Sequence, residues 1–389
     1  MGRSVQNTAE RIRVAIIQSR LAPFRVAFFQ RLANTGNIDL VVFCSDKEAS
    51  GKSAGATPPA GVRLHTLKTF ALGRLTLQFG LPGAILAGKF AVIIAEARLG
   101  LALTPLVLML CRLTGKRFLW WTCGWEPTEG KTLSSLKRFG RRLLFAAAHG
   151  GIAYSKTAQQ YLAQHGIAPE HTWIAHNSLD TDALLAIEAD LRQDADFVHR
   201  LRCERGVIEK HLVLFVGKLT KTKNVELLLN AFQSVHRDHP EAVLWIVGDG
   251  PERARLESLA RRSDGLPVQF LGETTEPRAI NAIYMAADVF ALPGTGGLAI
   301  NQAMTFGKPV VVSSADGTEE DLVTDGHNGL YFKSGDAADL AAKIVQLLRD
   351  RQLRETMGRR SREIIETRVN MKNMVNSFCD AIFNRRSET

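Results

Sequence analysis

Short apolar runs alternate with amphipathic stretches along most of this chain. In its second half, runs rich in Val, Leu, Ile and Phe predict six strands, at His211–Val216, Ala242–Val247, Val268–Leu271, Val289–Leu292, Val310–Val312 and Leu330–Phe332. Stretches with helical spacing fill the gaps, at Val225–Val235, Arg253–Ala260, Pro277–Ala287, Leu298–Phe306 and Ala337–Leu348. Because apolar runs without polar alternation are typical of parallel strands covered on both faces, this half predicts a doubly wound parallel sheet.

The first half follows the same alternation less regularly. Its predicted strands are Arg13–Gln18, Asp39–Cys44, Ala91–Ala95, Phe118–Trp121 and Gly151–Tyr154, and its clearest helices are Phe24–Ala33 and Thr132–Ala148. The stretch Ser45–Pro59 has few apolar residues and predicts a loop. We therefore expect an α/β protein with two doubly wound, Rossmann-like domains.

The expected domains are residues 1–178 and residues 179–370, joined near Asn177–Leu191. A last helix, within about residues 371–389, is expected to pack back on the first domain. Ligands of such sheets bind at the carboxyl ends of the strands, so we expect the site in a cleft that the two domains face.

One apolar run needs a separate interpretation. Leu99–Leu110 is about a dozen residues long and contains Pro105, whereas a bilayer-spanning helix needs about 20 apolar residues. A buried helix is the favoured interpretation, and a helix lying in a membrane interface is the alternative. The five dispersed cysteines predict free thiols in a reducing compartment. Arg11 and Arg13 interrupt any N-terminal apolar core, so no signal peptide is predicted and a cytoplasmic location is expected.

Positive charge is concentrated in the first half. Residues 1–175 contain 22 Lys/Arg and 8 Asp/Glu, a net charge of +14, whereas residues 176–389 contain 27 and 31, a net charge of −4. This asymmetry favours an anionic partner for the first half, such as nucleic acid, a membrane surface or a phosphorylated substrate. The alternative is a basic surface that serves solubility alone.

The segment Leu136–Phe145 is basic and amphipathic. Leu136, Phe139, Leu143 and Leu144 share one helical face, and most of the four cations lie off that face. Such a helix, at residues 136–145, is suited to an anionic leaflet on the inner face of the cytoplasmic membrane. A domain helix with a basic solvent face explains the same pattern equally well.

A glycine-rich segment stands out in the second half. Leu292-Pro-Gly-Thr-Gly-Gly-Leu298 follows a strand and leads into a helix that ends at Gly307. Exposed backbone N–H groups and the positive end of the helix dipole together bind anions, phosphates above all.

Two further strand ends carry related patterns. In Phe215–Val225, Lys218 leaves the strand and Lys223 precedes the helix, so that both ammonium groups are candidates to clamp a diphosphate; solvated surface lysines are the alternative. Val247-Gly-Asp-Gly-Pro251 predicts a tight turn, and the geometry of that turn is enough to account for both glycines. It lacks the third glycine of a dinucleotide fingerprint, which argues against NAD.

Taken in order, these pieces resemble the C-terminal half of family 4 glycosyltransferases, which are retaining enzymes with the two-domain GT-B fold. The matching text is Val216-Gly-Lys-Leu with Lys223-Asn-Val, Val247-Gly-Asp-Gly-Pro, Phe270-Leu-Gly, Ala287-Asp-Val-Phe-Ala-Leu-Pro293, Gln302-Ala-Met with Gly307-Lys-Pro-Val-Val, and Asp325-Gly-His-Asn-Gly-Leu330. The resemblance is dense over residues 211–350 and looser before them.

The resemblance implies roles by position. Lys218 and Lys223 would neutralise the donor diphosphate as it leaves, which makes them the implied catalytic cations. The implied donor-binding residues are Gly217, Gly272, Glu273, Thr274, Gly296, Gly297, Leu298 and Gln302. Among these, the loop Gly272–Thr274 corresponds to the family's base-reading backbone, and Gln302 to the glutamate that holds the ribose hydroxyls.

The chain also departs from the family at two positions. The family has two glutamates after the Pro293 position, with seven residues between them, and Gly294 and Gln302 stand there instead. A glutamine still hydrogen-bonds a ribose hydroxyl, but Gly294 has no side chain to offer. Glu320, in the acidic run 319–321, is a candidate substitute carboxylate; acids favouring a helix start are the alternative.

The first half supplies the expected acceptor side. After the strand Phe118–Trp121, Cys123 falls near the position of a family histidine, Trp125 is a candidate to stack on a sugar, and Glu126 is a candidate to polarise an acceptor hydroxyl. Core packing is the alternative for the tryptophan cluster. Arg25, after the first strand, is a candidate for an acceptor phosphate.

The sequence therefore predicts a metal-independent retaining glycosyltransferase, without a cofactor, that uses a nucleotide-diphosphate sugar. Its expected acceptor is a glycan, lipid-linked, in cell-surface polysaccharide or lipopolysaccharide assembly. A sugar-nucleotide-binding or scaffolding protein that has lost catalysis is the alternative. Nucleic-acid binding is not expected, because the chain has no recognised aromatic-basic module and its positive charge lies away from the phosphate-clamp half.

Overall fold

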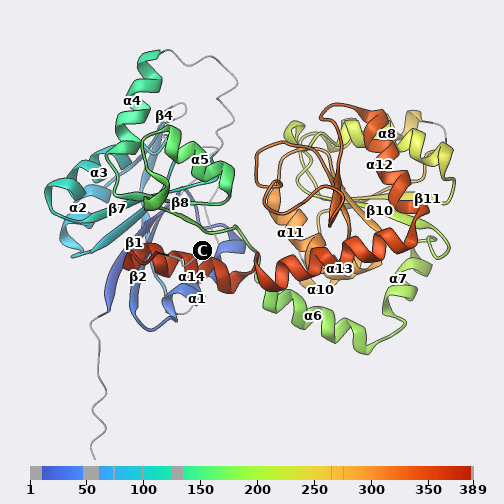
Figure 1. Cartoon of the computed structure of the whole chain (residues 1–389), viewed down its shortest axis with the longest axis horizontal. Helices are drawn as coiled ribbons and strands as arrows, with labels where there is room; N and C mark the ends of the chain where they lie inside the picture. Colours follow the sequence, from blue (N-terminus) through green and yellow to red (C-terminus); the bar gives the residue numbers. More distant parts are fainter. Residues whose placement is uncertain are drawn as a thin grey trace, which may run out of the picture. The chain divides into compact units, whose positions relative to one another are not determined.

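The computed structural model describes residues 11–46, 61–72, 75–98, 100–124, 135–263, 265–274 and 276–386. The chain divides into two compact units (Figure 1). Met1–His176 and Lys372–Thr389 form the first unit, and Asn177–Met371 form the second. These divisions lie beside the boundaries expected at 178/179 and 370/371.

The first unit is built on a seven-stranded parallel sheet with the strand order β3-β2-β1-β6-β7-β8-β9. Its strands are β1 (Ile12–Ile17), β2 (Ile38–Ser45), β3 (Arg63–Leu67), β6 (Val92–Glu96), β7 (Arg117–Thr122), β8 (Gly150–Ala153) and β9 (Thr172–Ile174). A separate antiparallel hairpin consists of β4 (Thr69–Leu72) and β5 (Leu75–Gln78).

Helices cover this sheet. They are α1 (Val26–Ala33), preceded by the 3-10 turn Pro23–Arg25, α2 (Leu81–Ala87), α3 (Thr104–Leu113), α4 (Ser135–Ala146) and α5 (Lys156–Gln164). The sequence predicted the central strands because they are buried apolar runs, such as Val14–Ile17 at 0% exposure. It missed β3, β9 and the hairpin, because an edge strand that is largely exposed and strands of three or four residues carry no clear apolar run.

The second unit contains a six-stranded parallel sheet with the order β12-β11-β10-β13-β14-β15. Its strands are β10 (His211–Val216), β11 (Ala242–Val247), β12 (Val268–Gly272), β13 (Val289–Leu292), β14 (Val310–Val312) and β15 (Gly329–Tyr331). Four of the six match the predicted bounds at both ends. One large core cluster holds the unit together, and the central strands contribute fully buried residues to it.

The helices of the second unit are α6 (Thr181–Gln193), α7 (Phe197–Glu204), α8 (Val225–Asp238), α9 (Arg253–Arg262), α10 (Pro277–Ala286), α11 (Gly297–Thr305), α12 (Ala337–Arg349) and α13 (Arg351–Thr367). The sequence did not predict α6, α7 or α13. Residues 177–191, expected as the join between the domains, mostly belong to α6, which is a helix of the second unit.

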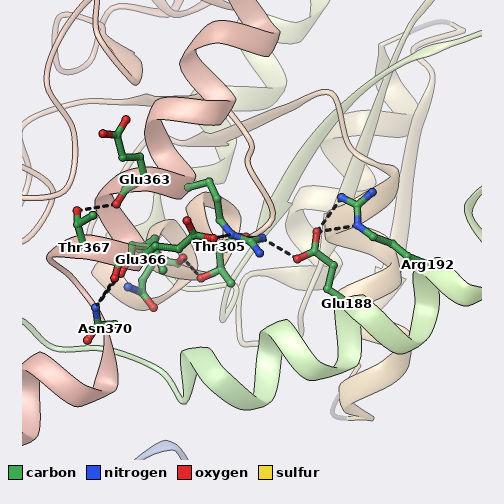
Figure 2. A network of polar contacts seen from close by, with 10 residues as sticks. Glu188, Arg192, Thr305, Glu363, Glu366, Thr367 and Asn370 are labelled. Atoms are coloured by element: carbon green, nitrogen blue, oxygen red, sulfur yellow. Dashed lines mark hydrogen bonds and ion pairs between the residues drawn. The ribbon is translucent and has the colours of Figure 1, made fainter.

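A buried carboxylate fastens α6 to the rest of the second unit. Glu188 is 5% exposed and accepts from Arg192 Nη2 at 2.8 Å and from Arg362 Nη1, on α13, at 2.6 Å. Arg362 also donates to the Thr305 carbonyl at the end of α11 (Figure 2). Arg362, whose side chain is 27% exposed, also donates from Nε to Glu366 Oε1 at 2.6 Å. Removing Glu188 would therefore break the link between α13 and α6 but leave Arg362 with one carboxylate partner.

The last helix, α14 (Met371–Phe383), packs on the first unit. Arg117, on β7, donates to the carbonyls of Ile382 at 2.9 Å and Ala381 at 3.2 Å. The Phe378 ring lies edge-on to Phe28 and Trp121, with centroids 4.7 and 4.9 Å away. The chain therefore crosses from the second unit to the first near residue 371.

Two expectations about helices of the first unit are corrected. Leu99 lies outside the described residues, and from Gly100 to Leu110 only one side of the helix is buried: α3 begins at Thr104, and it buries Val107 and Leu108 while Leu106 and Met109 are 46% and 64% exposed. In α4, Arg141 is not on a solvent face. It is 8% exposed and donates to Tyr161 Oη at 3.1 Å, because its long apolar stem packs while its head finds a partner.

Candidate functional site

In the second unit, the loops that follow β10 and β13 are closed tightly against each other. Thr295 N donates to the Thr222 carbonyl at 3.1 Å. A Cβ placed on Gly294 would lie under 3.0 Å from the backbone of both Thr222 and Lys223. This backbone arrangement therefore has no room for any side chain at position 294, and a glutamate there would require the two loops to separate.

Lys223 lies between these loops. Its Nζ donates to the Thr295 carbonyl, and a Cβ on Gly296 would lie under 3.0 Å from the same Nζ. Burial lowers the pKa of Lys223 below the usual lysine range, and the negative charge of Asp316 partly opposes the shift. A half-buried ammonium held only by a carbonyl retains the capacity to bind an anion.

The N-terminus of α11 completes this arrangement. Gly296 is its N-cap, with φ of 136°, and provides no side-chain hydrogen bond, and no acidic residue stands in the first turn. The N–H groups of Gly297 and Leu298 open this helix, and they are the groups for which phosphate binding stays a prediction from the sequence. Gly297 faces the loop after β14, where a Cβ would come within 3.1 Å of Thr318 Oγ1.

Close backbone contact also explains the glycines at the neighbouring strand ends. A Cβ on Gly248 or Gly250 would lie under 3.0 Å from the carbonyls of Gly217 and Leu219, respectively. Gly272, with φ of 74°, accepts from Gly248 N at 2.7 Å. The loops after β10, β11 and β12 thus form one continuous layer at the carboxyl edge of the sheet.

Gln302 is placed by α10 as well as by its own helix. Its Nε2 donates to Asn281 Oδ1 at 2.8 Å, and Asn281 is fully buried. The amide nitrogen of Gln302 is therefore engaged with protein, and its carbonyl oxygen is the group suited to a ligand hydroxyl. Sequence reasoning did not find Asn281, because an isolated asparagine within a helix carries no motif.

The acidic run at residues 319–321 divides into two environments. Glu319 is 2% exposed and accepts from the backbone N–H groups of Ala315 at 2.5 Å, Gly317 at 3.3 Å and Asp316 at 3.4 Å. Burial raises the pKa of Glu319, although those hydrogen bonds oppose the shift. Glu319 therefore shapes the loop after β14, whereas Glu320, the residue singled out from the sequence, is exposed.

At the carboxyl edge of the first sheet, Arg25 lies in an aromatic enclosure. Its guanidinium is centred 3.9 Å from the Trp121 ring and donates to Tyr154 Oη. Arg25 is 8% exposed, and its Nη1 is buried without a hydrogen-bond partner among the described residues. Burial raises the pKa of Tyr154 to about 12, so this phenol stays protonated at neutral pH.

A carboxylate lies beside this group. Glu96 ends β6, and its Oε2 accepts from Ser19 N at 2.9 Å and from Ser19 Oγ at 2.8 Å. Glu96 and Cys123 both lie close enough to Tyr154 to raise its pKa, which places Cys123 in the same neighbourhood as Arg25. Sequence reasoning missed Glu96, although a carboxylate directly after a predicted strand was a usable signal.

The site residues predicted from the sequence fall into groups according to where the structure places them. Lys223, Gly217, Gly296 and Gly297 come together around the loops after β10 and β13. Lys218 and Glu273 are exposed, and Gly272, Glu273 and Thr274 belong to the loop after the edge strand β12. Trp125 and Glu126 lie outside the described residues.

The sequence of the second unit matches that of known proteins. The sequence model of the family described as "Glycosyl transferases group 1" matches residues 205–364. The sulfoquinovosyl transferase SQD2 of Arabidopsis thaliana is 37% identical over 172 residues, which are 43% of this chain and 32% of that protein. A glycosyltransferase of Methanocaldococcus jannaschii is 27% identical over 242 residues, 61% of this chain and 59% of that protein. The matches thus span between a third and three fifths of these relatives.

The fold has counterparts among solved structures. HepE of Anabaena, in complex with UDP, superposes with a TM-score of 0.72 at 18% identity, covering 96% of this chain and 100% of that one. This likeness concerns the fold, and it spans both units. The sequence match and the fold agree: the chain carries a domain of the glycosyl transferases group 1 family at residues 205–364, within a GT-B fold.

Proposed function

We propose that this chain transfers a sugar from a nucleotide-diphosphate donor to a lipid-linked glycan acceptor, with retention of the anomeric configuration. The observation that carries the proposal is the half-buried ammonium of Lys223, held by the Thr295 carbonyl beside the uncapped N-terminus of α11. An ammonium group and free backbone N–H groups in one place fit the charge of a departing diphosphate. HepE, whose fold is similar, binds UDP.

The proposed chemistry needs no protein nucleophile. The bond between the anomeric carbon and the diphosphate oxygen breaks while the acceptor hydroxyl oxygen forms its bond on the same face. The hydroxyl proton passes to the departing diphosphate. Lys223 and Lys218 stabilise the negative charge that grows on the leaving group, and the remaining rate enhancement comes from positioning.

Gly294 constrains how the donor sugar is held. Because no side chain fits at this position, the sugar next to the diphosphate is contacted there by backbone alone. Glu319 does not substitute, since its two oxygens already accept backbone N–H groups. On this proposal the Gln302 carbonyl oxygen accepts from the ribose, and Gly272, Glu273 and Thr274 lie against the base.

The first unit would supply the acceptor site. Glu96 Oε2 is held by Ser19, and a carboxylate fixed in this way can accept from an acceptor hydroxyl through its other oxygen. Arg25, with one buried nitrogen unpartnered, provides positive charge close by. Because the proposed donor is a nucleotide sugar, we expect the reaction to occur on the cytoplasmic side of the membrane that carries the lipid acceptor.

A catalytically inactive sugar-nucleotide-binding protein is the second candidate, and the missing side chain at Gly294 is the observation that favours it. Thermal-shift measurements with a panel of nucleotide sugars would first identify a ligand, because a ligand that binds the folded state raises the apparent stability. Incubation with that donor and lipid-linked acceptors, followed by NMR of the product anomer, then tests transfer. An α-linked product from an α-linked donor supports the proposal. Binding without transfer or hydrolysis would favour the second candidate, and no binding to any nucleotide sugar would contradict both.

A further inference from the structure

Exposed apolar side chains are distributed very unevenly between the two units. Among the described residues, nine large hydrophobic side chains of the first unit are exposed, against Ile208 alone in the second. The nine are Phe70, Leu75, Phe79, Leu86, Leu106, Met109, Leu113, Phe139 and Leu143. Single exposed apolar residues are ordinary, but a concentration on one part of the surface indicates a contact with something outside the chain.

Helix α3 carries the clearest part of this surface. Leu106, Met109 and Leu113 are 46%, 64% and 81% exposed, and their spacing of three and four residues puts them on one side of the helix. The opposite side, with Val107 and Leu108, is fully buried. The helix is therefore apolar on both sides, although only one of them packs against the protein.

The neighbouring helices also expose apolar side chains. Helix α2 lies beside α3 (Figure 1) and exposes Leu86 at 44%. The ends of α3 and α4 are joined by Arg112 Nε, which donates to the Ala147 carbonyl at 2.6 Å. Helix α4 exposes Phe139 and Leu143, four residues apart, at 59% and 56%. We call Leu86, Leu106, Met109, Leu113, Phe139 and Leu143 together the apolar face.

The charge around the apolar face has one sign. None of α2, α3 and α4 contains an Asp or a Glu, and residues 61–176 as a whole contain 14 Lys/Arg and 4 Asp/Glu. Exposed cations stand beside the apolar positions, at Lys89, Arg112 and Arg142. Apolar side chains among cations, with no carboxylate on the same helices, fit the interface of an anionic lipid leaflet.

From this pattern we propose that the first unit docks on an anionic membrane surface through the apolar face. The six side chains enter the boundary between the lipid headgroups and the acyl chains, while Lys89, Arg112 and Arg142 contact lipid phosphates. The described residues include no helix long and apolar enough to span a bilayer, so this docking is peripheral. It combines the expectation for residues 136–145 with the interface alternative given for the run Leu99–Leu110, and it extends both to α2. It does not depend on transfer activity, because it is measured without substrate.

Vesicle cosedimentation of the full chain tests the proposal. The wild type is expected to bind vesicles of phosphatidylcholine mixed with phosphatidylglycerol, to bind phosphatidylcholine alone much more weakly, and to be released by high salt. The triple variant Leu106→Gln, Met109→Gln, Leu113→Gln should bind the anionic vesicles on the order of 10²-fold more weakly, because three apolar contacts are lost while helix propensity is kept. Arg142→Gln should weaken binding by about fivefold.

Ile208→Gln is the control, since it removes an exposed apolar side chain, 42% exposed, from the second unit and should bind like the wild type. Circular dichroism and thermal melting confirm that each variant is folded. A second measurement uses Met109→Trp and Ile208→Trp with brominated lipids, in which only the Trp at position 109 should add quenching beyond that of the wild type. Equal vesicle binding by the triple variant and the wild type would overturn the proposal. So would concentration-dependent self-association of the wild type that the triple variant abolishes, because a second copy of the chain would then cover the apolar face.

Discussion

The two units share a parallel α/β architecture, yet they place different chemistry at the carboxyl ends of their strands. In the second unit the loops provide one half-buried lysine, free backbone N–H groups and glycines that bring backbones into contact. In the first unit the equivalent edge provides side chains: Arg25 enclosed by aromatic rings, and Glu96 fixed by Ser19. The second unit thus has the chemistry of an anion site, and the first has mixed charges suited to hydroxyls.

The surfaces of the two units also differ from each other. The first unit is basic and exposes apolar side chains, whereas the second is slightly acidic and exposes almost none among its described residues. Two domains with the same architecture can therefore serve two different tasks, because loops and surfaces vary independently of the buried strands. If this division holds, changes in one unit should alter its own task and leave the other intact.

The largest expected effect concerns the lysine of the second unit. Lys223→Ala should lower kcat for sugar transfer by roughly 10²- to 10³-fold, because a preorganised positive group is lost where the leaving charge develops. Lys218→Ala should also slow transfer, by about 10²-fold if it touches the same diphosphate. Lys221→Ala, at an exposed neighbouring position, is the control and should keep nearly normal rates. Normal turnover by the Lys223 variant would refute its assigned role, and vesicle binding should be unchanged in all three.

The next effect concerns stability in the second unit. Glu188→Ala should lower the free energy of unfolding by about 2 kcal/mol, because Arg362 loses the buried carboxylate that joins α6 to α13 while it keeps Glu366 as a partner. Chemical denaturation followed by circular dichroism measures the change. Glu170→Ala, which removes an exposed carboxylate of the first unit, should change stability by no more than about 0.5 kcal/mol. Equal effects of the two substitutions would show that Glu188 does not fasten the helix.

Two glycines allow the same substitution to be compared across the units. Gly294→Ala should destabilise the chain by about 1–3 kcal/mol and weaken nucleotide binding, because the new Cβ would press on the backbone of Thr222 and Lys223. Gly83→Ala, in α2, meets no atom within 4 Å and should stabilise the chain by about 0.5–1 kcal/mol through helix propensity. Thermal melting of both variants without nucleotide measures the change in stability, and melting with nucleotide measures the change in nucleotide binding. A tolerated Gly294→Glu that improves donor binding would show that the loops separate easily.

A smaller effect is expected at the acceptor side. Glu96→Gln should raise the acceptor KM by about tenfold, because a charged hydrogen-bond acceptor becomes neutral. The donor-induced thermal shift should stay as in the wild type, since the change lies in the other unit. Glu170→Gln serves as the control. A change in donor binding and none in acceptor KM would break the proposed division of tasks.

The smallest effect is a shift in pH dependence. Burial lowers the pKa of Lys223 below the ordinary lysine value of about 10.4. As the pH rises, its ammonium group therefore loses its proton earlier than that of an exposed lysine. Transfer should therefore decline on the alkaline side, and the decline should begin at lower pH than for an exposed lysine. In Lys223→Arg the decline should move to higher pH, because the guanidinium keeps its proton. An alkaline limb that is identical in the two proteins would mean that another group is titrating.

The sequence determined the second unit well and the first only in outline. His211–Val216 and Ala242–Val247 were predicted to the residue because they are almost entirely apolar, are buried over most of their length and are bounded by turn residues. In the first unit, β9 has three residues and β3 is largely exposed, so tertiary pairing rather than local pattern makes them strands. Helix α6 was missed although Asp180 caps its start and accepts from Ala183 N at 3.3 Å, a local signal that the sequence carries; only its link to Arg362 depends on a distant partner.

The candidate site shows the same limit. The glycines and lysines of the second unit could be found from the sequence because backbone requirements leave a local pattern, as at Gly296 before α11. Only the tertiary structure decided why position 294 is a glycine, since the clash is with Thr222 and Lys223, some seventy residues earlier. It also decided that Glu319 faces inward, that Arg25 meets Trp121 and Tyr154, and that α3 exposes an apolar side. Local sequence determines which conformations a segment prefers, whereas contacts between distant segments determine which of its groups remain available for function.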